Sequence, residues 1–139
     1  MGSYDDGGTQ NVGYEEYEPE PESWGKLISH TTEIPSHTLV GSDVTVIGRG
    51  ADSTIQINKL YISSTHCKIY RIQDDTYCED CSSNGTFILT PNAPKSEKLS
   101  KCKKVIQPGT KIILVKHNAK QKIGFFTLKF LAQILHISK

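Results

Sequence analysis

The chain has 139 residues, which predicts a single compact domain and leaves no room for the two lobes of a protein kinase. Its formal net charge is +1, but residues 1–23 hold seven of the 15 acidic residues and none of the 16 basic ones, so residues 24–139 carry a net charge of +8. No apolar run approaches the roughly 20 residues of a membrane-spanning helix, which excludes a helical membrane protein.

The first 23 residues differ in composition from the rest of the chain. They contain no Ile, Leu or Phe, and their only Val is Val12. Such a segment cannot bury enough apolar surface to offset the entropy lost on ordering. We therefore predict a disordered acidic tail over residues 1–23 and a folded domain over residues 24–139. The basic surplus of that domain favours anionic partners, although a solvated lysine-rich face has the same composition.

From Trp24 onward, short segments rich in β-branched and aromatic residues alternate with turn signals. Ile55 and Ile57 fall on one face of one such segment, and Cys67 and Ile69 on one face of the next. We predict strands over residues 45–48, 53–58, 65–72, 76–80, 86–89, 111–116 and 125–130. Their regular spacing is typical of an antiparallel β-sandwich or barrel.

Two later segments lack a clear strand pattern. Residues 91–104 are polar and rich in Pro and Lys, so we predict a long exposed loop there. Residues 131–138 are compatible with a short helix or with an extension of the last strand.

Three polar stretches lie next to predicted strands. An arginine that follows a strand can present a rigid fork of donors to a carboxylate or phosphate, and serines and an Asn-Gly turn supply further polar groups. Each stretch taken alone is ordinary loop chemistry, so the prediction depends on their joint order and spacing. The stretches are Gly48-Arg49, Ser63-Ser64-Thr65-His66 and Asn84-Gly85.

In this order and spacing, the three stretches resemble the signature of the forkhead-associated (FHA) domain, over residues 24–130. The resemblance implies an all-β fold, namely a two-sheet antiparallel β-sandwich of about eleven strands that binds phosphothreonine peptides through loops at one end. It also implies a binding domain rather than an enzyme, with no cofactor and no metal.

Residues 78–88, CEDCSSNGTFI, are most similar to FHA domains of checkpoint serine/threonine kinases. That narrower resemblance implies the regulatory domain of a kinase in DNA-damage and cell-cycle signalling, located in the nucleus and also in the cytoplasm.

The resemblance also implies roles for individual residues. Arg49 and Ser63 bind the phosphate, Ser64 is a further phosphate contact, and Ser83 and Asn84 flank the peptide. The residues that shape the loops are Gly48, His66, Gly85 and Thr86. These roles agree with the chemistry, because a phosphate of about −1.5 to −2 charge requires a cation and converging neutral donors. An asparagine amide can both donate to and accept from a peptide backbone.

Ser64 departs from the family pattern, since many members have a basic residue at this position. We expect a weaker electrostatic attraction for phosphate, offset by Lys59 or Lys68. The family commonly reads the residue three positions after the phosphothreonine, and the candidates for that contact here are the side chains of residues 58–61 and 82–83.

Cys78 and Cys81 have the spacing of two zinc ligands. A structural zinc site requires four ligands, normally including a second close pair, whereas Cys67 and Cys102 are isolated in the sequence. We therefore predict no metal site. Because no secretory signal accompanies the cysteines, we predict free thiols in a reducing compartment.

Nucleic-acid binding is the main alternative function, because lysines are concentrated in residues 95–104. Arginine–aromatic interleaving and known nucleic-acid motifs are absent from the sequence, which argues against it. The sequence also contains no Gly-rich phosphate cradle before a helix and no kinase catalytic motif. As a catalytic base, His66 would lack a nucleophile at matching spacing.

Thr9 precedes Gln10 within the acidic segment. In checkpoint kinases such Thr-Gln sites are phosphorylated, and the FHA domain of a second copy then binds them. The resemblance therefore implies phosphorylation-dependent self-association through Thr9, in addition to binding of other phosphothreonine proteins.

Overall fold

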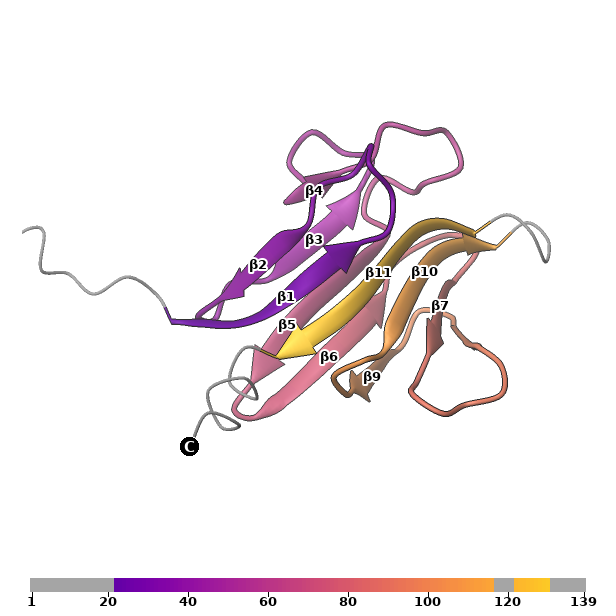
Figure 1. Ribbon diagram of the computed structural model, residues 1–139. Helices are drawn as coiled ribbons and strands as arrows, with labels where there is room; N and C mark the ends of the chain where they lie inside the picture. The colour runs from indigo at the N-terminus through magenta and orange to yellow at the C-terminus, as the bar shows by residue number, and fades with distance from the viewer. Residues whose placement is uncertain (1–21, 117–121, 131–139) are drawn as a thin grey trace, which may run out of the picture.

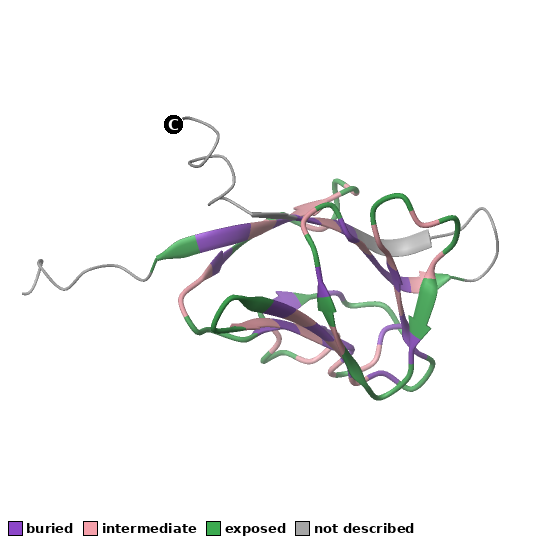
Figure 2. Ribbon diagram, turned by 90° about the horizontal axis from the view of Figure 1, so that it is seen from below, coloured by how far each residue is buried: buried purple, intermediate pink, exposed green. Residues whose placement is uncertain are grey.

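The computed structural model describes residues 22–116 and 122–130, which form eleven strands in two stacked sheets (Figures 1 and 2). The strands are β1 (Ser23–Ser29), β2 (His37–Val40), β3 (Thr45–Gly48), β4 (Ile55–Gln56), β5 (Cys67–Ile72), β6 (Asp75–Asp80), β7 (Thr86–Leu89), β8 (Glu97–Leu99), β9 (Lys103–Ile106), β10 (Lys111–Lys116) and β11 (Lys122–Phe130). The all-β two-sheet prediction is confirmed. Over the described ranges, no helix is long and apolar enough to cross a membrane.

One sheet has six strands in the order β2-β1-β11-β10-β7-β8, and the other has five in the order β4-β3-β5-β6-β9. All pairings are antiparallel except β3 with β4, which are parallel. The first and last strands pair along their length, with Gly25 opposite Phe130 and Ser29 opposite Phe126. The six-stranded sheet can therefore be completed only when β11 is available to pair with β1.

The hydrophobic core lies between the two sheets and follows the alternation of the strands (Figure 2). Ile55 and Ile57 are both buried, as are Cys67 and Ile69, so each pair that was predicted to share a face lies on a buried one. Full burial of one such aliphatic side chain stabilises the fold by about 1.5–3 kcal/mol. The packed sheets thus form a rigid support for the loops at their ends.

Several strand boundaries match the sequence-based prediction. Residues 45–48, 86–89 and 111–116 coincide with β3, β7 and β10. Strand β1 begins at Ser23, one residue before the predicted start of the domain. Residues 1–21 of the predicted tail and the segment 131–138 lie outside the described residues.

The prediction of one long loop over residues 91–104 is wrong, because the segment contains β8 and the beginning of β9. Both are edge strands. Glu97 and Lys98 are exposed in β8 and only Leu99 is buried, so the strand lacks an apolar pattern. Charged residues are common on edge strands because they discourage pairing with other chains.

Candidate functional site

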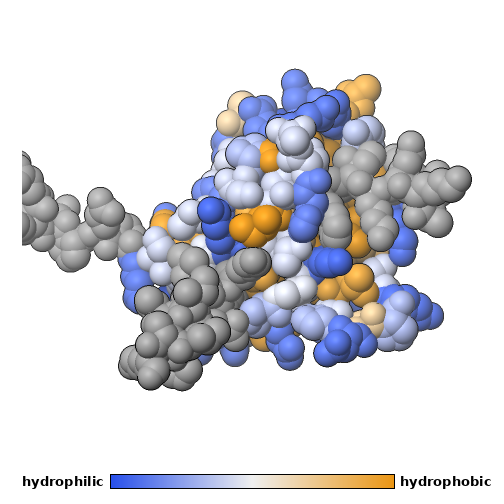
Figure 3. Space-filling model, in the orientation of Figure 1, coloured by the Kyte–Doolittle hydropathy of each residue, from blue (hydrophilic) through white to orange (hydrophobic). Residues whose placement is uncertain are grey.

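Three loops distant in sequence meet at one end of the sandwich, at the top of Figure 1. Strands β3 and β6 both pair antiparallel with β5, so the ends of β3 and β6 lie beside the start of β5. These ends lead into or out of residues 49–54, 57–66 and 81–85. On the face seen in Figure 3, this end is mostly hydrophilic.

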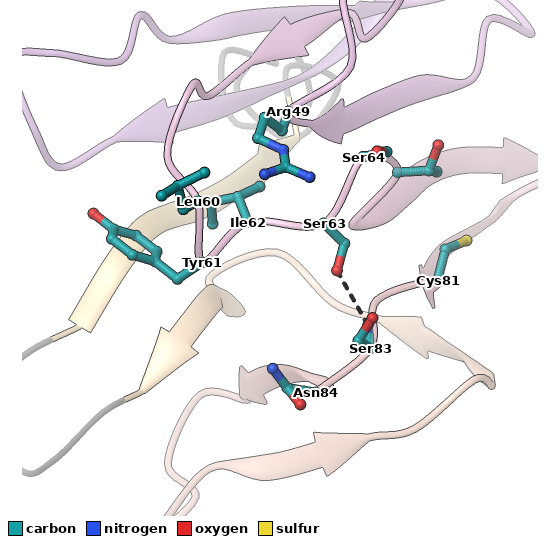
Figure 4. A pocket seen from close by; sticks show the side chains of 10 residues that line it. Arg49, Leu60, Tyr61, Ile62, Ser63, Ser64, Cys81, Ser83 and Asn84 are labelled. Atoms are coloured by element: carbon teal, nitrogen blue, oxygen red, sulfur yellow. Dashed lines mark hydrogen bonds between the residues drawn. The ribbon is translucent and has the colours of Figure 1, made fainter.

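The loops line an open cavity of about 520 Å³. All five residues predicted to contact a phosphopeptide line it, and Figure 4 shows their side chains around one space. These residues are Arg49, Ser63, Ser64, Ser83 and Asn84. Lys59 and Lys68, which were expected to supplement the charge, are not among the lining residues.

Arg49 is held through its backbone. Its N–H donates to the Ser63 carbonyl at 2.9 Å, and its own carbonyl accepts from the Gln56 amide at 3.1 Å. Within residues 22–116 and 122–130 the guanidinium makes no ion pair or hydrogen bond, and it points toward Ser63 in Figure 4. A positioned guanidinium without an acid partner is suited to bind an anion from outside the protein.

The glycine before this arginine permits the close approach of two loops. A Cβ atom at Gly48 would lie 2.1 Å from the Ser64 carbonyl oxygen, which no side chain can tolerate. The contact is reinforced by the Gly50 N–H, which donates to the same Ser64 oxygen at 3.0 Å.

Ser63 is positioned by the third loop and by His66, at the end of its own loop. The Ser83 backbone N–H donates to the Ser63 hydroxyl oxygen at 3.1 Å, and the Ser63 N–H donates to His66 Nδ1 at 3.1 Å. Because the hydroxyl oxygen already accepts one bond, its hydrogen remains available to a ligand. The contact with Ser83 also links the second loop to the third (Figure 4).

His66 braces the loops from beneath. It is buried, and because Nδ1 accepts from Ser63, Nε2 carries the proton and donates to the Leu114 carbonyl at 2.9 Å. Burial lowers the pKa of His66, although contacts with Leu114, Asp80 and Gly85 partly oppose that shift. The ring is therefore neutral at pH 7 and connects the two sheets.

Sequence reasoning missed Asp80, which organises the third loop. Its side chain is buried, and one carboxylate oxygen accepts the Ser82 N–H at 3.1 Å and the Ser82 hydroxyl at 2.6 Å. The same oxygen accepts the Thr86 hydroxyl at 2.7 Å, and the other accepts the Lys101 N–H at 2.8 Å. The Asp-x-Ser spacing is the local signal that could have identified it, because Asp side chains often accept from the N–H two residues later.

The same network fixes the charge of Asp80. Burial alone raises the pKa of a carboxyl group, but the bonds from Lys101, Ser82 and Thr86 outweigh it, so the pKa of Asp80 is lowered. The carboxylate thus stays ionised at neutral pH as a fixed anchor for the loop.

Ser82 cannot read a bound peptide, contrary to the prediction for residues 82–83. Its side chain is buried, and its hydroxyl donates to Asp80 while accepting the Gly85 N–H at 2.7 Å. Ser83 and Asn84 are exposed instead, and Gly85 adopts a φ of 101°, which favours glycine. Leu60 and Tyr61, from the other predicted segment, line the cavity and are exposed.

All four cysteines are free thiols. Cys67 and Cys78 are buried in the core, whereas Cys81 lines the cavity. In the part of the chain that the structure describes, no group of three or more His, Cys, Asp or Glu residues could hold a metal ion.

Known proteins share the sequence pattern and the fold of this chain. The family model for the FHA domain matches residues 45–114. The chain is 35% identical over 108 residues to the probable serine/threonine-protein kinase fhkE of Dictyostelium discoideum, an alignment that covers 73% of this chain and 14% of the kinase. The chain therefore spans only a small part of that relative.

Solved structures show the same fold at low sequence identity. The N-terminal FHA domain of Saccharomyces cerevisiae Rad53p, in complex with a phosphothreonine peptide, matches with a TM-score of 0.66 at 18% identity, covering 82% of this chain and 98% of that one. An engineered FHA with a Myc-pTBD peptide matches with a TM-score of 0.67 at 17% identity, covering 84% and 98%. FHA domains are binding modules, not enzymes. With the family model spanning half of its residues, this chain belongs to the FHA domain family.

Proposed function

We propose that this FHA domain recognises phosphothreonine peptides in the cavity lined by Arg49, Ser63, Ser64, Ser83 and Asn84. Arg49 forms a two-point, charge-assisted contact with the phosphate, and the hydroxyls of Ser63 and Ser64 donate to its remaining oxygens. Asn84 pairs with the peptide backbone through its amide. Because these loops are already bonded to one another, binding costs little ordering of the protein.

One observation carries the proposal. The Arg49 guanidinium has no acid partner among the described residues, and it faces a serine whose hydroxyl oxygen is already engaged by the Ser83 N–H. A cation and a spare O–H donor thus lie at one cavity, which suits a phosphate ester better than a neutral ligand.

The test is a titration of fluorescent phosphothreonine peptides, followed by anisotropy. We expect Arg49→Ala to weaken binding about 100-fold, since roughly 3 kcal/mol of charge-assisted bonding is lost. Arg49→Lys, which keeps the charge but loses the fork, should be intermediate. Unphosphorylated peptide and Lys59→Ala, an exposed cation outside the cavity, are the controls. Unchanged affinity in Arg49→Ala would show that the phosphate binds elsewhere.

We further propose that the domain is the regulatory part of a checkpoint serine/threonine kinase that acts in the nucleus and also in the cytoplasm. The support is the kinase name of the Dictyostelium relative, together with the resemblance of residues 78–88 to checkpoint kinases. The test is imaging of the tagged native protein before and after DNA damage. Exclusion from the nucleus under both conditions would contradict the checkpoint role.

We also propose that one ligand of the cavity is phosphorylated Thr9, in the acidic segment of a second copy of this protein. A chain phosphorylated at Thr9 should form concentration-dependent dimers in sedimentation velocity, because the cavity of one copy binds the phosphothreonine of another. Combining the phosphorylation with Arg49→Ala should restore the monomer. Monomeric behaviour of the phosphorylated parent at all concentrations would rule out self-association through Thr9.

A further inference from the structure

The hydroxyl groups of the second loop differ in how far the protein itself engages them. The Ser63 hydroxyl oxygen accepts the Ser83 N–H at 3.1 Å, and Thr65 is half-buried. Ser64 is exposed, and among the described residues its hydroxyl makes no hydrogen bond. Ser64 is therefore the serine of this loop whose hydroxyl an enzyme can reach and modify without breaking a contact of the fold.

The segment that carries Arg49 is held against Ser64. The Gly50 N–H donates to the Ser64 carbonyl at 3.0 Å, and the Ser53 hydroxyl donates to the same oxygen at 3.4 Å. One residue earlier, the Arg49 N–H donates to the Ser63 carbonyl at 2.9 Å. Arg49 and Ser64 line the same cavity, and Figure 4 shows the guanidinium beside the loop that carries both serines. A negative charge on the Ser64 side chain would thus lie next to a positioned cation.

The charge of the cavity makes it sensitive to such a change. Arg49 is the one charged residue among the described residues that line the cavity, and its guanidinium has no acid partner in the same part of the chain. Phosphorylation of a serine adds about −1.5 to −2 charge and three acceptor oxygens, and opposite an arginine it forms about one to three charge-assisted hydrogen bonds. A phosphate on Ser64 would satisfy Arg49 from within the protein and repel the phosphate of a ligand.

We propose that Ser64 is a phosphorylation site, and that its phosphate pairs with Arg49 and closes the cavity to phosphothreonine peptides. This regulation rests on the proposed function of the cavity. The modifying enzyme is a serine/threonine protein kinase that uses ATP. The Ser64 Oγ forms a bond to the γ-phosphorus, the bond to the leaving ADP breaks, and the hydroxyl proton passes to the catalytic aspartate of the kinase. Hydrolysis by a phosphatase restores the serine and releases inorganic phosphate, so the block is reversible.

The first measurement compares the full chain with and without phosphoserine at position 64, introduced during translation. In an anisotropy titration, affinity for a phosphothreonine peptide should fall at least about 100-fold, the loss expected for Arg49→Ala, because the phosphate occupies the cation and adds repulsion. Phosphoserine in place of Ser42 is the matched control. Ser42 is exposed and precedes β3, whereas Arg49 follows that strand, so this chain should bind like the parent.

A second measurement tests the pairing without a peptide. Phosphorus NMR follows the second pKa of the phosphoserine, which is about 6 when the group is unpaired. Pairing with Arg49 should lower that pKa, and Arg49→Ala should raise it back toward about 6, because a nearby cation favours the doubly charged phosphate. Phosphoserine at position 42 should titrate alike with and without Arg49.

The modification itself is detected by mass spectrometry of the native protein, isolated from cells after phosphatase inhibition. The absence of phosphoserine at position 64 there would overturn the inference while the proposed function stands. So would parent-like peptide affinity of the phosphorylated chain, or a phosphorus titration that Arg49→Ala leaves unchanged. If the unphosphorylated parent binds no phosphothreonine peptide, the proposed function is wrong, and the titration alone decides whether the phosphoserine pairs with Arg49.

Discussion

Asp80→Asn should destabilise the domain and weaken ligand binding together, although Asp80 lies beneath the cavity and does not line it. The substitution keeps the shape of the side chain but removes its charge and replaces one acceptor oxygen with an NH₂ group. If that group occupies the position of the oxygen that now accepts the Lys101 N–H, two donors face each other. The opposite orientation instead disrupts the bonds from Ser82 and Thr86.

The magnitude follows from the bonds that are lost. A hydrogen bond to a charged group contributes about 1.5–3 kcal/mol, and a buried donor left without an acceptor costs about 1–3 kcal/mol. With partial relaxation of the loop, we expect the free energy of unfolding of Asp80→Asn to fall by roughly 2–4 kcal/mol at pH 7. Because the Ser82 bonds fix the third loop, phosphopeptide affinity should fall by roughly tenfold as well.

The free energy of unfolding is measured by urea unfolding, followed by the fluorescence of Trp24. This is the single tryptophan of the chain, and it is buried. Asp75→Asn is the matched control, because Asp75 is an exposed aspartate at the other end of the same strand, β6. It should change stability by less than about 0.5 kcal/mol. If the free energy of unfolding of Asp80→Asn also differs from that of the parent by less than about 0.5 kcal/mol, and the variant binds phosphopeptide normally, Asp80 does not anchor the loop.

The difference between the parent and Asp80→Asn should also depend on pH. The pKa of Asp80 is lowered in the folded state, so the unfolded chain binds the proton at a higher pH than the folded protein does. The stabilisation is complete above the ordinary carboxyl pKa and is lost as the pH falls through the lower folded pKa. The difference should therefore be largest near neutral pH and should narrow at acid pH.

Three further predictions concern the loops themselves. Gly48→Ala should cost roughly 1–3 kcal/mol of stability and weaken phosphopeptide binding, because its Cβ meets the Ser64 carbonyl at 2.1 Å; thermal unfolding and peptide titration measure the two effects. Ser63→Ala should weaken phosphopeptide binding about tenfold while the circular dichroism spectrum stays that of the parent, because it removes a donor to the phosphate. Lowering the pH below about 6.5 should destabilise the parent, because burial lowers the pKa of His66 and the unfolded chain therefore binds the proton more readily. In urea unfolding, the stability of His66→Gln should depend less on pH than that of the parent.

Each of these has a defined contrary result. Parent-like unfolding and affinity in Gly48→Ala would mean that the first two loops can separate at no cost. Full affinity in Ser63→Ala would show that the Ser63 hydroxyl does not bind the phosphate. Burial lowers the pKa of His37 too, so His37→Gln is the matched control for the pH experiment. If that variant alone loses the pH dependence, His66 is not its source.

The strands that alternate between the core and the surface could be read from the sequence. In β5, Cys67 and Ile69 face the core while Lys68 does not, and this period-two pattern is a local property of the chain. Strand β8 was hidden because it is a three-residue edge strand with one buried side chain, so its polarity is that of a loop. Ser82 looked like a surface hydroxyl because a sequence does not show that an aspartate two residues earlier is buried beside it.

The sequence by itself determined the β-rich character, the family resemblance and five of the residues that line the cavity. Only the tertiary structure decided that Arg49, Ser63 and Asn84 meet, since their convergence depends on β3 and β6 lying on either side of β5. Likewise, the lowered pKa of Asp80 depends on a backbone N–H from Lys101, 21 residues later, and the His66 brace depends on the Leu114 carbonyl, from a strand in the other sheet. Strand propensity acts between neighbours in the chain, whereas burial and loop convergence arise from pairing of segments far apart in sequence.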